Sequence, residues 1–197
     1  MSIGGFSLQV RRGIATIFAV RFRPRADTAL ALATAVAFCF VYYIGAHSQS
    51  ALLSFVLFTV FGTGLLCVIL PTFYVLIIRG EPLANLGITK RRWGVALALS
   101  GFFAAGSLPG LLDTAAATDA EVDLPAHLLV NALVLWEPFF VHGWLQLRFE
   151  RAFGILPGIF LASFCFAAYH VGTFPLAAMV GLFVVGLLQA ALFRAVG

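Results

Sequence analysis

The sequence predicts an all-α fold, a polytopic transmembrane helical bundle of about six spans with an N-terminal amphipathic interfacial helix. The chain has 197 residues, of which 62% are hydrophobic and 10% are charged, whereas soluble domains are about 45–50% apolar and about 25% charged. Long apolar runs also recur with short polar gaps between them. One helical membrane domain therefore explains the chain better than one or two soluble domains.

A helix needs about 20 mainly apolar residues to cross a hydrocarbon core about 30 Å thick. Six segments reach or approach this length, running from Thr28 to Ala46, Ala51 to Ile78, Gly94 to Leu112, His127 to Leu147, Pro157 to Phe174 and Leu176 to Phe193. In the second segment, Pro71 and the pair Gly62 and Gly64 predict a kink.

Residues 1–26 form a basic amphipathic segment ahead of the N-terminal transmembrane helices, which occupy residues 27–125. Arginines alternate there with apolar side chains, a pattern typical of a helix lying in the membrane interface. A cleaved signal peptide is the alternative interpretation. The long apolar run after Thr28 and the poor cleavage site around Gly45 favour a retained first span.

The charges support one orientation, because basic residues gather on the cytoplasmic side of a membrane protein. With six crossings, the basic residues all fall on one side: Arg11, Arg12, Arg21, Arg23, Arg25, Arg79, Lys90, Arg91, Arg92, Arg148, Arg151 and Arg194. The acidic loop from Asp113 to Asp123 falls on the other. We expect a multi-pass protein of the plasma membrane with both termini in the cytoplasm, in contact with membrane lipid.

Glu137 is the acidic residue that lies deep within a predicted span. An ionised side chain there costs at least about 2.5–3.5 kcal/mol, so such residues usually mark function. A neutral glutamic acid bonded to a neighbouring helix would be the structural explanation. The functional one is proton transfer, since burial moves a carboxyl group toward the basicity of a useful general base.

His170 is the second candidate, late in the next predicted span. At 1.5 Å per residue, Glu137 lies about 16 Å from Arg148 and His170 about 20 Å from Pro157, so the two side chains could meet. Phe166 shares a helix face with His170 and could wall the same cavity, or simply pack. His142 is about 140° around the helix from Glu137, which makes direct contact doubtful and a place at the cytoplasmic mouth more plausible.

Several site classes find no support. The cysteines Cys39, Cys67 and Cys165 lie in apolar segments without metal-binding spacing and are expected to be small buried hydrophobes. Neither a metal nor any other cofactor is predicted. Nucleic acid is not an expected partner, because no stripe of aromatic and basic residues accompanies the net charge of +4.

Three motifs near the C-terminus resemble those of the CAAX-processing (CPBP, or Abi) family of intramembrane proteases. The stretch from Glu137 to Gly143 is similar to the first motif, and Phe166-Ala-Ala-Tyr-His170 matches the second, FxxxH. The run from Phe183 to Gly186 resembles the opening of the third. By this resemblance, residues 126–197 would be the protease core.

The chain departs from the family pattern in three places. Pro138 stands where the family has a second glutamate, and His142 stands where it has an arginine. The last motif would continue to a histidine and an asparagine on a further helix, beyond Gly197. We therefore expect the chain to be a truncated product or a fragment.

The resemblance implies an intramembrane endopeptidase that hydrolyses a peptide bond. Glu137 would activate a water molecule, and His170 would hold that water or stabilise the oxyanion, with His142 and Phe166 in support. The substrate would be a peptide or protein, prenylated in CAAX-type processing or a bacteriocin in bacteriocin-type processing. Zinc would be underligated by one glutamate and one histidine, which favours a metal-independent mechanism.

Two alternatives stay open. The departures at Pro138 and His142 favour a catalytically inactive membrane scaffold or immunity protein with the same fold. A small transporter, with Glu137 as proton carrier, is less favoured because the chain lacks an internal repeat and several buried charges.

Overall fold

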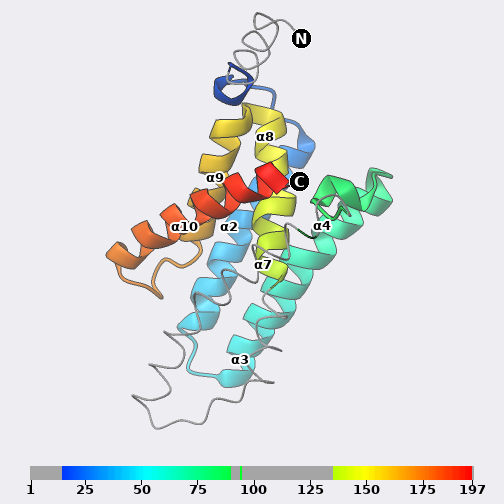
Figure 1. Cartoon of the computed structure of the whole chain (residues 1–197). Coiled ribbons are helices and arrows are strands. Elements are labelled where there is room, and N and C mark those ends of the chain that lie inside the picture. The colour runs from blue at the N-terminus through cyan, green and yellow to red at the C-terminus, as the bar shows by residue number, and fades with distance from the viewer. Residues whose placement is uncertain (1–14, 90–93, 95–134, 197) are drawn as a thin grey trace, which may run out of the picture.

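A computed structural model describes residues 15–89, Gly94 and 135–196 (Figure 1). Within these residues the expected all-α class is confirmed, since no strand forms and the only β feature is an isolated bridge between Val171 and Phe174. The expected span from Gly94 to Leu112 and the acidic loop lie almost wholly outside the described residues. The span from His127 to Leu147 is described from Leu135 onward.

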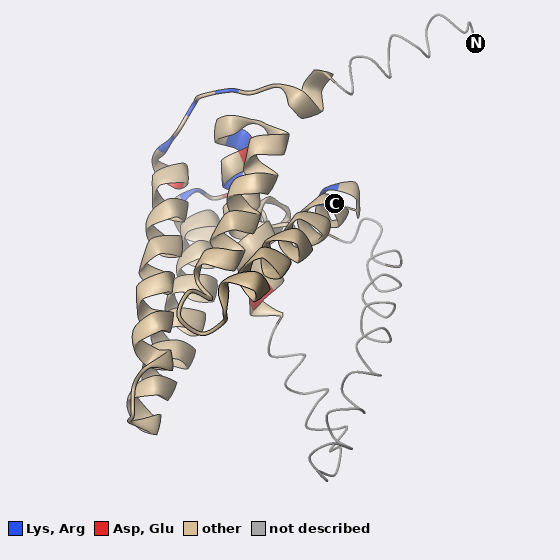
Figure 2. Cartoon of the chain, turned by 90° about the vertical axis from the view of Figure 1, so that its left-hand side faces the viewer, with Lys and Arg blue, Asp and Glu red and all other residues tan. Residues whose placement is uncertain are grey.

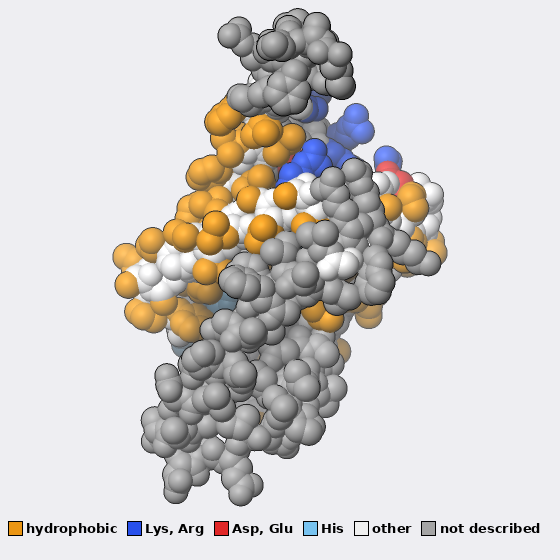
Figure 3. Space-filling model, viewed as in Figure 1, with side chains coloured by type: hydrophobic (Ala, Val, Ile, Leu, Met, Phe, Trp, Pro, Cys, Tyr) orange, Lys and Arg blue, Asp and Glu red, His pale blue; other side chains and the backbone are white. Residues whose placement is uncertain are grey.

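Among the described residues, three helices are long and apolar enough to cross a membrane: Ala26–Ala46, Ala51–Ile78 and Leu176–Val196. The first is α2 and the third is α10, while the second is a continuous run of α3 (Ala51–Phe55), η1 (Val56–Ile69), α4 (Leu70–Phe73) and η2 (Tyr74–Ile78). Apolar side chains remain exposed along all three, including Phe40, Leu52 and Val180. Lipid is the solvent that such surfaces favour. The surface in Figure 3 is correspondingly rich in hydrophobic side chains.

The second long helix stays helical through the residues expected to kink it. Leu70 and Tyr74 keep right-handed helical backbone angles on either side of Pro71, and η1 and η2 are π-helical. Gly62 serves close packing instead, because a Cβ there would lie 2.9 Å from the Phe38 ring of α2.

A second pair of helices carries the candidate residues. The helices α7 (Trp136–Pro138), η4 (Phe139–Gln146) and α8 (Leu147–Phe153) form one continuous run, which turns at Gly154 into α9 (Ile155–Ala168). The expected helix from Pro157 to Phe174 is thus wrong in its bounds. The chain leaves the helix after Ala168 because turns follow, with Gly172 at φ 86° and then Pro175, which cannot continue a helix.

The helix 136–153 packs between α2 and the helix 51–78 on one side and α9 on the other, while α10 crosses the bundle obliquely (Figures 1 and 2). The core between them is mainly aromatic and aliphatic. Its fully buried large side chains include Phe38, Phe140, Trp144 and Leu145. This packing holds the start of α7 beside the end of α9.

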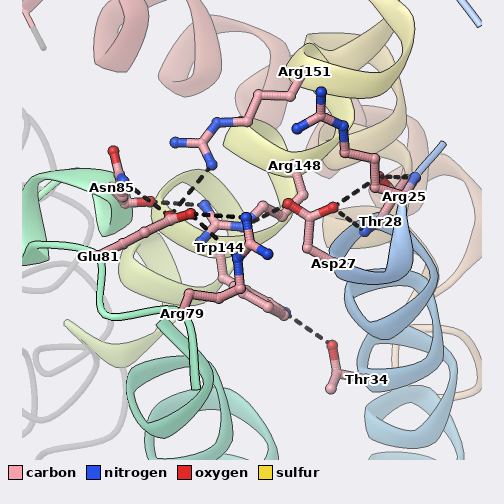
Figure 4. A network of polar contacts seen from close by, with 10 residues as sticks. All are labelled: Arg25, Asp27, Thr28, Thr34, Arg79, Glu81, Asn85, Trp144, Arg148 and Arg151. Atoms are coloured by element: carbon pink, nitrogen blue, oxygen red, sulfur yellow. Dashed lines mark hydrogen bonds and ion pairs between the residues drawn. The ribbon is translucent and has the colours of Figure 1, made fainter. Parts of the chain in front are cut away.

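In the described part of the chain, arginine positions gather toward one end of the bundle (Figures 2 and 4). This end, called here the arginine end, includes Arg25, Arg79, Arg148 and Arg151, with Arg21 and Arg194 beside Arg151. Figure 4 shows the network of polar contacts at this end. Arg148 donates to the Asn85 carbonyl oxygen at 2.7 Å and lies 3.9 Å from the Asp27 carboxylate. The Trp144 indole N–H donates to the Thr34 hydroxyl at 3.0 Å. These contacts join α2, α8 and the turn after the second long helix.

Burial lowers the pKa of the Arg148 guanidinium to about 10, and Arg151 acts in the same direction. At Glu81, partial burial opposes ionisation, but the hydrogen bond from Asn85 and the charges of Arg151 and Arg79 lower the pKa of the carboxyl overall. The ion pairs with Arg79 and Arg151 therefore favour the ionised form of the Glu81 carboxyl.

Of the expected amphipathic helix over residues 1–26, the described part is helical from Ala15 to Phe18 and again at Ala26, where α2 begins, and residues 19–25 are not helical. Arg21 and Arg23 instead donate their backbone N–H groups to the carbonyls of Phe153 and Ala152, each at 2.9 Å. Pro24 explains the break, because it disfavours helical angles at the residue before it. Residues 1–14 lie outside the described part.

Candidate active site at the start of helix α7

Glu137 lies in the first turn of the described helix 136–153, and its side chain is partly buried. Pro138 follows it there without disrupting the helix, because backbone N–H groups of the first turn have no partner within a helix. A carboxylate in this turn also interacts favourably with the helix dipole. The local sequence therefore suits an acidic side chain at the end of the bundle opposite Arg148.

The Glu137 carboxyl is bound by a residue that sequence reasoning missed. The Tyr169 hydroxyl donates a hydrogen bond to Glu137 Oε1, and Tyr169 is only 4% exposed. Tyr169 is the last variable position of the FxxxH motif. The sequence could have pointed to Tyr169, because a tyrosine within an apolar segment needs a hydrogen-bond partner for its hydroxyl.

His170 lies just beyond the end of α9, beside Tyr169. The two rings stack with centroids 4.1 Å apart. Nδ1 of His170 is 2.9 Å from the Phe166 carbonyl oxygen. Because a carbonyl only accepts, Nδ1 carries the proton in this contact, and neutral His170 presents the lone pair of Nε2. His170 can thus accept a hydrogen bond through Nε2.

Aromatic rings enclose this pair. Phe166 lies edge-on to His170 at 5.5 Å and to Tyr169 at 5.8 Å. From α2, Tyr42 lies 5.8 Å from His170, and Phe38 lies 5.0 Å from Tyr169. Phe166 therefore borders the candidate site, as its spacing from His170 predicted, and α2 supplies the opposite wall.

The structure brings Glu137 and His170 to the same aromatic cluster without joining them. Both contact Tyr169, and in the described part of the chain no hydrogen bond links the carboxyl directly to the imidazole. The arrangement places a carboxyl group at the hydroxyl of Tyr169 and an imidazole acceptor against its ring. Such a set can take a proton from a water molecule and hold that water by a second contact.

His142 lies elsewhere, five residues further along the helix and 4% exposed. Its Nδ1 is 3.0 Å from Gln146 Oε1, and its ring stacks on Phe193 of α10 at 5.7 Å. The doubt about contact with Glu137 was justified. The expected position at the cytoplasmic mouth is not observed, because η4 buries His142 against α10.

Gln146 belongs to a row of buried polar side chains, called here the polar row, that runs from His142 through Gln146 to Glu150 toward the arginine end. Its Nε2 donates to Glu150 Oε1 at 2.8 Å and to the Ala190 carbonyl at 3.1 Å. These two acceptors fix the amide, so Gln146 Oε1 accepts from His142. The row is fully bonded and joins the helix 136–153 to α10.

Comparison with protein-family models, curated proteins and solved structures finds no match to this chain. The resemblance to the CPBP family therefore rests on the three motifs themselves. Among the residues with described positions, no group of three or more histidine, cysteine, aspartate or glutamate side chains could hold a metal ion.

Proposed function

We propose that the chain is a multi-pass membrane protein that hydrolyses a peptide bond within the membrane, with the arginine end in the cytoplasm. The hydrogen bond between Tyr169 and Glu137 carries this proposal. It places a carboxyl group, oriented by a phenol, within the aromatic cluster that also holds His170. These are the two residues on which the motifs of the CPBP family converge.

In this mechanism Glu137 takes a proton from water while the water oxygen attacks the scissile carbonyl carbon. The proton then passes to the leaving amine nitrogen as the C–N bond breaks. His170 accepts a hydrogen bond from the same water at Nε2, because Nδ1 is committed to the Phe166 carbonyl. Tyr169 orients Glu137, because its one hydroxyl proton is donated to the carboxyl group.

Glu137→Gln tests the proposal in the full chain reconstituted in liposomes, with fluorogenic prenylated and unprenylated peptides as probes. The substitution removes the base and keeps an oxygen that can accept from Tyr169, so cleavage should be lost while the fold is retained. Glu81→Gln, at the arginine end, is the matched control and should cleave normally. Cleavage by Glu137→Gln at the unaltered rate would reject Glu137 as the base.

Metal dependence provides a second test of the mechanism. A glutamate that activates water directly needs no bound ion, so treatment with a chelator should leave the cleavage rate unchanged. Loss of cleavage that zinc alone restores would contradict this mechanism.

A non-catalytic membrane scaffold or immunity protein is the second candidate. Two hydrogen bonds favour it. Glu137 is bonded to Tyr169 rather than to His170. His142, at the position of the motif arginine, is bonded to Gln146. A scaffold predicts that Glu137→Gln keeps partner binding, and that the unaltered protein cleaves none of the peptide probes.

A further inference from the structure

A cavity of about 410 Å³ lies at the arginine end, far from Glu137. Five segments line it: the N-terminal segment, the turn around Asn85, α8, the first turn of α9 and the end of α10. Glu150, which lines it, is 13 residues from Glu137 on the same helix, about 20 Å along its axis. The cavity is therefore separate from the candidate active site.

Positive charge dominates the lining of this cavity. Three arginines, Arg21, Arg151 and Arg194, border it together with one acidic side chain, Glu150. The side chains of Arg151 and Arg194 are 43% and 50% exposed, so their guanidinium groups stay accessible. Guanidinium groups bind phosphate in a bidentate manner and keep their charge at any physiological pH.

Two ion pairs offset part of this positive charge, since Arg151 lies 3.6 Å from Glu81 and Arg194 lies 3.7 Å from Glu150. The Glu150 side chain is 8% exposed and accepts from Gln146 at 2.8 Å. Burial raises the pKa of the Glu150 carboxyl, although Gln146 and Arg194 oppose the shift. The Glu150 carboxyl thus belongs to the buried polar row, whereas Arg151 and Arg194 stay about half exposed despite their ion pairs and line the cavity with Arg21.

An exposed apolar strip adjoins the cavity. In the N-terminal segment, Phe18, Val20 and Phe22 are 63%, 77% and 80% exposed. The two backbone hydrogen bonds from Arg21 and Arg23 to the end of α8 hold this strip in place. Large apolar side chains beside arginines are typical of protein segments that lie in the membrane interface.

We propose that this cavity binds the headgroup phosphate of an anionic phospholipid, with Arg21, Arg151 and Arg194 around the phosphate and the apolar strip beside the acyl chains. The position of the cavity favours a lipid over a soluble phosphate compound. It lies where the long apolar helices end, at the level that headgroups occupy. The apolar strip would gain nothing from a soluble ligand.

The test measures lipid binding to the full chain in detergent by native mass spectrometry, with phosphatidylglycerol as the probe and phosphatidylcholine for comparison. Phosphatidylglycerol should bind more tightly, and each of Arg21→Gln, Arg151→Gln and Arg194→Gln should weaken its binding by about fivefold. Arg79→Gln is the matched control, because Arg79 is equally exposed at 49% and pairs with Glu81 but does not line the cavity.

Equal weakening by Arg79→Gln would overturn the proposal, since it would show general surface attraction. Displacement of phosphatidylglycerol by millimolar inorganic phosphate or glycerol 3-phosphate would also overturn it, in favour of a soluble ligand. If Arg194→Gln fails to fold because Glu150 loses its partner, Arg21→Gln decides the matter, because the backbone of Arg21 rather than its side chain holds the segment to α8.

Discussion

The Tyr169 hydroxyl donates to the Glu137 carboxyl across 32 positions of the chain. This bond joins the first turn of the helix 136–153 to the end of α9. It also explains how an acidic side chain is accommodated in an apolar bundle, because a buried carboxyl group needs a hydrogen-bond partner.

Tyr169→Phe should lower peptide cleavage roughly 10–100-fold, since a buried hydrogen bond to a charged group contributes about 1.5–3 kcal/mol. Rates on the prenylated peptide probe, measured in liposomes, provide the check. Tyr43→Phe is the control, because Tyr43 lies on α2 and is 47% exposed. Equal rates for Tyr169→Phe and the unaltered protein would mean that Tyr169 does not orient the base.

Gly143→Ala should destabilise the fold by about 1–3 kcal/mol, because a Cβ there would clash with the Leu86 carbonyl oxygen and leave the helix no room beside the turn. Gly181→Ala, on α10, meets no atom within 4 Å and should stabilise by about 0.5–1 kcal/mol through higher helix propensity. Thermal unfolding in detergent measures both. A neutral Gly143→Ala would show that the two segments separate readily.

Thr34→Val should cost about 1–3 kcal/mol, because it leaves the buried indole N–H of Trp144 without its acceptor. Thr63→Val offers a contrast. The Thr63 hydroxyl is buried with no hydrogen-bond partner in the described structure, so its loss should be neutral or slightly stabilising. Unfolding temperatures that rank the two variants the other way would contradict this assignment.

Glu81 should make the fold sensitive to acid. Its pKa is lowered in the folded state, so its ion pairs stabilise the protein above the unfolded carboxyl pKa of about 4.3 and stop doing so as the pH falls through the lowered value. Unfolding temperatures between pH 3 and pH 7 should therefore fall less steeply for Glu81→Gln than for the unaltered chain.

Glu150→Gln should change the same pH profile in the opposite direction. Burial raises the pKa of Glu150, so its ionisation opposes folding as the pH rises through the unfolded value. The substitution should remove that penalty above about pH 5. Profiles of both variants that match the profile of the unaltered chain would show that neither carboxyl group is linked to folding.

Composition was sufficient to predict the helical class and three apolar helices of membrane-spanning length, because a long apolar run leaves the backbone few ways other than a helix to satisfy its hydrogen bonds. Helix ends were less accurate. The end of α9 at Ala168 and the extended chain after Phe18 depend on turn residues and on backbone partners from distant segments. A hydropathy profile contains no information on turn residues or on distant backbone partners.

The sequence by itself predicted an apolar helical protein and singled out Glu137 and His170 as its candidate functional groups. Only the tertiary structure decided that Tyr169 contacts both of them, that His142 faces α10, and that arginines from distant segments line one cavity. The physical reason is that local pattern sets the free energy of burying each segment. Which side chains then share a hydrogen bond depends on the relative rotation and depth of packed helices, which many distant contacts set together.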